Sequence, residues 1–205
     1  MRCTSRITLT LVLALAAACS STRDAKESEP KPGAWLTPSP LLEQQMVDEA
    51  ARLPWTRGLE RIEQIRWFAA VGEPAYETLL ALSADPRDDV AAAALSALGA
   101  TGDRRLVDPI RAADPGAANR GIDLRLERAR TLLRLGDWDD VPVLVEGLMD
   151  ERVYTRALSI QALEEATGER HGFDPRGTED EREKSLERWK RWWLARTGDP
   201  IRAGS

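Results

Sequence analysis

The chain has 205 residues, of which 42% are hydrophobic and only 5% aromatic. This length allows one ordinary domain with a tail, and alanine and leucine supply most of the apolar side chains. Such a mixture favours closely packed helices over a β-sandwich, and no alternating run of β-formers is long enough for a strand. We therefore predict an all-α fold.

The formal net charge is −5. Loss of residues 1–18, which carry Arg2 and Arg6, would lower this charge by two, to −7. Sequence-independent binding of nucleic acid needs a basic surface. The acidic balance therefore argues against nucleic acid as a partner.

Residues 1–18 have the pattern of a signal peptide. Two arginines precede an apolar run of 12 residues from Ile7 to Ala18, whereas a membrane-spanning helix needs about 20. The following Cys19 and the four residues before it (LAAAC) resemble the lipobox of bacterial lipoproteins, with the favoured leucine one position early. The resemblance implies that Cys19 is lipidated and that the lipid alone holds the protein on a membrane. Ordinary secretory cleavage beside an incidental cysteine is the alternative.

These features predict an exported lipoprotein that faces the periplasm, on the outer membrane if the cell has two membranes. Cys3 would leave with the signal peptide, so Cys19 would have no disulfide partner in the mature chain. Residues 19–39 are rich in Ser, Pro, Lys and Glu and show no apolar period, which predicts a lipid-anchored disordered tether. The sequence leaves open whether Trp35 docks on the domain or contacts lipid.

Four pairs of a glycine and an acidic residue recur at intervals of 30, 34 and 32 residues. They are Gly72-Glu73, Gly102-Asp103, Gly136-Asp137 and Gly168-Glu169. Each pair follows a stretch with helical apolar spacing, and the first three precede a second such stretch. Glycine suits a helix C-terminus because the left-handed conformation costs it little, and an acidic residue suits the start of the next helix. We predict a helix pair in each unit, within a repeat domain at residues 40–177.

The clearest unit spans residues 85–113. Asp85 is the predicted N-cap of its first helix, and Pro86 is the predicted first helical residue. The expected buried positions are Val90, Ala94, Ala97 and Leu98 in the first helix, and Leu106, Val107 and Ile110 in the second. An opening helix is predicted at residues 40–52, where Ser39 and Pro40 provide a start signal.

The string Asp85-Pro86, Val90, Ala93-Ala94, Ala97-Leu98-Gly99 and Gly102-Asp103 resembles the HEAT repeat, in the short bacterial form grouped with phycobilisome-lyase-type repeats. The family's arginine after the valine is missing here, although Arg125 and Arg156 keep it in later units. The resemblance covers roughly residues 56–168. It implies a right-handed α-solenoid of about four HEAT-like helix pairs with end-capping helices, in which the second helices line a partner-binding surface. A helical bundle with chance periodicity is the alternative.

Residues 178–197 are predicted to form a Trp-rich capping helix, followed by a disordered tail at residues 198–205. Thr178 and Glu181 match a capping box at its start. Leu186, Trp189 and Trp193 share one face, while the other face is charged, as the end of a solenoid requires.

No pattern indicates catalysis, a cofactor or a metal. His171 is the only histidine, and zinc usually needs three or four nitrogen or sulfur ligands, so a loop or packing role is expected for it. The acidic pairs Asp88-Asp89, Asp139-Asp140 and Glu164-Glu165 are explained by capping and solvation. No phosphate loop, nucleophile elbow or EF-hand spacing is present. We expect a protein that is not an enzyme and that uses no cofactor, metal or small-molecule substrate.

The predicted function is an envelope-anchored scaffold that binds a protein partner in the cell envelope. The candidate contact residues are Glu77, Arg104, Asp108, Arg111 and Glu146 on the second helices, and Trp192 in the capping helix. One alternative is a cell-wall or glycan-binding module that uses the cluster of Trp189, Trp192 and Trp193. Another is a bilin-lyase-like enzyme, which some relatives of the family imply but for which the sequence supplies no matching reactive group.

Overall fold

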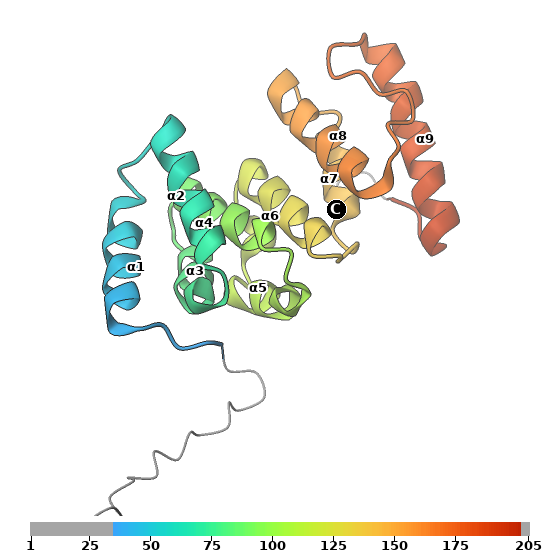
Figure 1. The fold of residues 1–205 in the computed structure, drawn as a ribbon. Coiled ribbons are helices and arrows are strands. Elements are labelled where there is room, and N and C mark those ends of the chain that lie inside the picture. Colours follow the sequence, from blue (N-terminus) through green and yellow to red (C-terminus); the bar gives the residue numbers. More distant parts are fainter. Residues whose placement is uncertain (1–34, 202–205) are drawn as a thin grey trace, which may run out of the picture. The chain divides into compact units, whose positions relative to one another are not determined.

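The computed structural model describes residues 35–201 and has the predicted all-α fold there (Figure 1). Within these residues there are nine α-helices, three short 3-10 helices and no strand. The α-helices are α1 (Pro40–Arg52), α2 (Gly58–Val71), α3 (Tyr76–Ser83), α4 (Asp88–Ala100), α5 (Val107–Ala113), α6 (Ile122–Arg134), α7 (Val141–Gly147), α8 (Val153–Thr167) and α9 (Glu179–Thr197). The 3-10 helices η1 (Glu73–Ala75), η2 (Arg104–Leu106) and η3 (Ala117–Asn119) precede α3, α5 and α6.

The predicted signal peptide, Cys19 and the tether as far as residue 34 lie outside the described residues, as do residues 202–205. None of the helices that the structure describes combines the length and the apolar character that a membrane crossing needs. Trp35, which is described, packs edge-on against Tyr76 with 5.0 Å between the ring centroids. Of the two possibilities that the sequence left open for this ring, docking on the domain is the one observed.

Two of the predicted helix starts are confirmed. Ser39 caps α1 by accepting a hydrogen bond from the Leu42 N–H at 3.4 Å. At α9, the Glu181 N–H donates to the Thr178 hydroxyl and the Glu181 carboxylate accepts from the Thr178 N–H, so both halves of the capping box are present.

The predicted start of α4 is wrong by a few residues. We expected Asp85 to cap a helix beginning at Pro86, but α4 begins at Asp88. The Asp85 carboxylate accepts hydrogen bonds from the backbone and the guanidinium of Arg87. Because this tight turn already uses the carboxylate, Asp85 does not cap the helix.

The four predicted Gly-acidic turns are present. Their glycines have positive φ angles between 69° and 87°, which residues with a Cβ rarely adopt. The acidic residues then act differently from one another. Asp103 caps η2, as predicted for the start of a second helix, by accepting from the Arg105 N–H. Glu73 instead binds the Arg105 guanidinium of the next unit at 2.8 Å.

The order of the helix contacts follows the order of the units (Figure 1). Helix α2 packs on α4, α4 on α6, and α6 on α8. Alongside them, α1 packs on α3 and α3 on α5, and α7 packs on α9. First helices therefore contact first helices of the neighbouring units. Among the second helices α3 contacts α5, while the opening helix α1 and the capping helix α9 contact the second helices α3 and α7.

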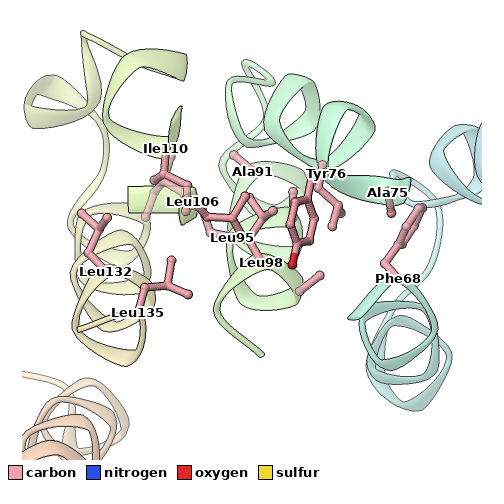
Figure 2. Packing of buried hydrophobic residues seen from close by; sticks show 14 of the residues in the cluster. Phe68, Ala75, Tyr76, Ala91, Leu95, Leu98, Leu106, Ile110, Leu132 and Leu135 are labelled. Atoms are coloured by element: carbon pink, nitrogen blue, oxygen red, sulfur yellow. The ribbon is translucent and has the colours of Figure 1, made fainter. Parts of the chain in front are cut away.

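Helix α4 lies at the centre of the N-terminal core (Figure 2). Its Val90, Ala91, Ala94 and Leu98 are fully buried. Leu95 and Leu98 lie between Tyr76 of α3 and the leucines of α6. Because its other core positions are mostly alanine, α2, α3 and α6 can all approach its backbone closely.

Helix α6 joins two hydrophobic clusters. Leu124 and Leu132 belong to the cluster around α4, whereas Leu126, Ala129 and Leu133 belong to a second cluster with α7, α8 and α9. A helix buried on two sides needs apolar residues over more than one stripe, which explains why its apolar positions are so closely spaced.

Short Asp-x-Arg turns link neighbouring units through ion pairs. The Asp103 carboxylate binds Arg105, and the Arg105 guanidinium also reaches Glu73, 32 residues earlier. Asp150 binds Arg152 in the same way, and Arg152 reaches Asp123, 29 residues earlier, at 2.7 Å. Arg105 and Arg152 therefore each pair within their own turn and with the preceding unit.

Arg156 in α8 fastens the loop before α9. Arg156 is only 5% exposed. The guanidinium donates to the carbonyl of Pro175 at 2.8 Å and to the carbonyls of Asp150 and Glu151 at 2.6 and 2.8 Å. A buried guanidinium is tolerated here because carbonyl oxygens satisfy its donors.

We expect Arg156→Met to lower the free energy of unfolding by about 2–4 kcal/mol, because the variant keeps most of the volume but leaves buried carbonyls without donors. Urea unfolding followed by circular dichroism would measure this change. Arg176→Met, at an exposed arginine in the same loop, is the matched control and should change little. Equal stability of the Arg156 variant and the wild type would contradict the assignment.

The pKa of Asp103 is held below its ordinary value of 3.8, first by hydrogen bonds from the Arg105 side chain, with burial opposing them. A lowered carboxyl pKa stabilises the fold above pH 3.8, and this contribution is lost as the pH falls through the lowered value. Asp103→Asn keeps the cap but not the charge. We expect the stability difference from wild type to be largest near pH 7 and to shrink below about pH 4. Chemical unfolding at several pH values would test this, and a constant difference would contradict it.

Candidate functional site

Three of the predicted contact residues line one groove at the surface of η2 and α5. Opposite them lies the turn between α6 and α7. We call this hollow of about 490 Å³ the Trp138 groove; its lining residues are Arg104, Val107, Asp108, Arg111, Gly136, Asp137, Trp138 and Asp139. Two neighbouring units thus contribute to one surface.

Arg111 and Asp137 form the fixed part of the groove. The Arg111 Nε donates to Asp137 Oδ2 at 2.8 Å, and the same guanidinium lies 3.7 Å from carboxylate oxygens of Asp139 and Asp140. Burial alone would lower the pKa of Arg111, but the Asp137 hydrogen bond and the three carboxylates outweigh it and raise the pKa. The other oxygen of Asp137 accepts from the Asp139 N–H at 3.1 Å, so its carboxylate is held on both sides.

Other charges of the groove are free to meet a partner. The Asp139 side chain is 85% exposed, and its ion pair within residues 35–201 is the long one to Arg111. Asp108 is exposed and forms no ion pair within the described residues. The Arg104 guanidinium lies over the turn, 3.5 Å from where a Cβ of Gly136 would be. The groove therefore offers carboxylates and a guanidinium side by side.

Trp138 connects the groove to the C-terminal helix. Its ring centroid lies 6.3 Å from that of Trp192 in α9. The Arg196 guanidinium lies over the Trp138 ring at 4.2 Å and over the Trp192 ring at 5.7 Å. This cation–π arrangement holds the end of α9 beside the groove. Trp192, a predicted contact residue, is therefore half-buried next to the groove without lining it.

The two remaining predicted contact residues do not join this site. Glu77 is exposed on α3 but does not line the groove. Glu146 on α7 is half-buried, and its carboxylate lies 4.0 Å from the Arg125 guanidinium of α6. Helix α7 turns this side chain toward its own unit, so Glu146 has a packing role.

His171 packs in the loop before α9, as expected. Its imidazole stands edge-on to the fully buried Trp189, with 4.5 Å between the ring centroids. The Arg188 Nε donates to the His171 carbonyl at 2.6 Å, and the Ser185 hydroxyl donates to the Gly172 carbonyl at 3.0 Å. These bonds hold the loop in a conformation in which His171 has a φ of 47°.

A second hollow, of about 600 Å³, lies along α9. Its lining residues are Met149, Asp180, Glu183, Lys184, Leu186, Glu187, Arg188, Lys190 and Arg191. Several of these charges pair along the helix, such as Lys190 with Glu187 at 2.8 Å. Such pairs stabilise an exposed helix. The charges along α9 are therefore explained by helix stability, and no ligand is needed to account for them.

The sequence analysis missed Trp138, Asp137 and Asp139 as members of the site, and it missed Arg196. A signal was available for Trp138: a large aromatic residue directly after a Gly-acidic turn has no place in the apolar period of either adjoining helix. No local signal was available for Arg196, because its contact depends on how α9 folds back.

Comparison of the chain with protein-family models, with curated proteins and with solved structures finds no match. Among residues 35–201, no group of three or more His, Cys, Asp or Glu side chains is arranged to hold a metal ion. Among the described residues, the Trp138 groove is therefore the feature that bears most directly on function.

Proposed function

We propose that this protein is an exported, lipid-anchored scaffold that binds a protein partner in the cell envelope and has no catalytic role. In this proposal, the helix pairs form a right-handed HEAT-like α-solenoid of about four units, with end helices that cap it. Lipidation of Cys19 would hold the mature chain on the membrane surface.

The contacts between successive units support the proposed solenoid. In a helical-repeat array, each unit contacts only its neighbours. The sequence α2, α4, α6, α8 follows this rule. The ion pairs that join Arg105 to Glu73 and Arg152 to Asp123 span 32 and 29 residues, close to the interval between the Gly-acidic pairs.

The Trp138 groove is the observation that carries the proposed partner binding. It combines an aromatic side chain with exposed charges of both signs and a rigid Arg111–Asp137 pair. Tryptophan and arginine are the residues that most often dominate binding energy at protein interfaces. A loop or extended segment of a partner that carries complementary charges would fit between α5 and the α6–α7 turn.

Glycan binding is a second candidate function, because Trp138 and Trp192 form a partly exposed aromatic pair. Aromatic rings can stack on the apolar faces of sugars as they stack on other flat groups. The surrounding aspartates and arginines favour a charged peptide over a neutral sugar, so we rank protein binding first. A bilin-lyase-like enzyme would need a reactive group, and His171, packed on Trp189, would be the residue to test.

A photo-crosslinking amino acid at Asp108 in intact cells should give a discrete protein adduct that is absent when the label replaces the exposed Glu63 of α2. The adduct should disappear when Arg104→Glu and Asp139→Lys reverse the free charges of the groove. Mass spectrometry of the adduct would show whether the crosslinked partner is a protein or a peptidoglycan fragment. Identical adducts from both positions, or adducts that persist after charge reversal, would overturn the proposed site. Attachment to peptidoglycan fragments would instead favour the glycan-binding function.

Cys19→Ser should move the protein from the membrane fraction to the soluble envelope fraction, because lipid would be its only anchor. Cell fractionation and immunoblotting would follow this change, with Cys3→Ser as the matched control that keeps the membrane association. Unchanged membrane association of the Cys19 variant would sink the anchoring proposal.

A further inference from the structure

The outer face of α2 carries exposed apolar side chains. Helix α2 packs on α4 and also contacts α1, through Gln64 with Glu49 and Glu60 with Arg52, but these contacts leave Leu59 and Ile62 in water. Trp55 in the preceding turn is 83% exposed, and Leu59 and Ile62 on α2 are 66% and 46% exposed. We call Trp55, Leu59 and Ile62 the end patch. A cluster of large apolar side chains in water marks an interaction surface.

The turn that displays Trp55 is held by bonds on both sides of it. Leu53 is buried, and its carbonyl accepts from the Arg61 guanidinium at 2.8 Å. The Thr56 hydroxyl is buried and lies 2.6 Å from Gln64 Oε1. The Arg57 guanidinium donates to the carbonyls of Pro54 and Thr56. Every neighbour of Trp55 is therefore fixed, and the tryptophan itself is presented to solvent at little cost in entropy on binding.

The length of chain between Cys19 and Trp35 points to lipid as the occupant. Sixteen residues separate the two positions, and a chain of that length spans at most about 55 Å. Trp35 is fixed on Tyr76, just before α1. Helix α1 has 13 residues, or about 20 Å, and it leads from Trp35 to the turn of Trp55. The end patch thus lies within reach of the membrane that would hold Cys19.

The chemistry of the end patch also suits a membrane surface. Tryptophan prefers the boundary between headgroups and acyl chains, where its ring is buried and its N–H stays wet. Leu59 and Ile62, on the helix that follows, supply further exposed apolar area. The nearby Arg57 guanidinium is already paired with Asp89 at 3.4 Å and bonded to the carbonyls of Pro54 and Thr56, so the membrane contact depends on the apolar side chains.

We infer that the end patch rests on the phospholipid surface to which the N-terminal lipid anchors the protein, with Trp55 inserted among the headgroups. This inference rests on the proposed anchoring. It assigns a second, weaker membrane contact that fixes the orientation of the domain. The Trp138 groove, on a different part of the chain, would then have a defined orientation relative to the membrane and to its partner.

The test uses the lipidated protein incorporated into phosphatidylcholine vesicles that contain a lipid brominated in its acyl chains. Bromine quenches tryptophan fluorescence only on close approach. We expect quenching in the wild type and loss of most of that quenching in Trp55→Phe. Trp192→Phe is the matched control and should leave the quenching unchanged. Leu59→Ser should weaken the quenching of Trp55, because the patch would insert less deeply.

The outcomes separate the two proposals. Failure of the protein to float with the vesicles would overturn the anchoring. Flotation with equal quenching in wild type and Trp55→Phe would overturn the end-patch inference alone. A dimer on analytical ultracentrifugation that Trp55→Ser dissociates would show that a second copy covers the end patch, and this result would also overturn the inference.

Discussion

The structure depends on the burial of α4 on three sides. Its core positions face α2, α3 and α6 at once, and only small side chains allow three helices to approach one backbone. A Cβ on Gly99 would lie 3.3 Å from Thr131 Cα of α6, and the Thr131 hydroxyl donates to the Leu95 carbonyl of α4 at 3.0 Å. This close approach sets the distance between first helices, and the turns, ion pairs and second helices fit around it.

The helices were largely predictable because their signals are local. The period of apolar residues in α4 and α6, the Ser39 cap and the Thr178 capping box each specify an element within a few residues of sequence. The start of α4 was not predicted, because the carboxylate of Asp85 has a competing partner in Arg87. Ile62 has the spacing of a buried helix position, yet it is 46% exposed because no helix among residues 35–201 covers it.

The candidate site was predictable only in part, for the same physical reason. Arg104, Asp108 and Arg111 are polar positions on a short second helix, and helical spacing alone places them on one side. The other wall comes from the following unit, and its position depends on how α6 packs. The contact of Arg196 with Trp138 joins residues 58 positions apart in the chain. No local pattern encodes such a contact.

The Asp-x-Arg turns have a consequence for how this sequence can diverge. Arg105 and Arg152 are each neutralised first by an aspartate two residues earlier, and only secondarily by an acid of the preceding unit. Replacement of Glu73 or Asp123 would therefore not strand an uncompensated charge. A substitution in one unit then imposes little on its neighbour, so the sequences of successive units can change independently while the apolar contacts between them persist.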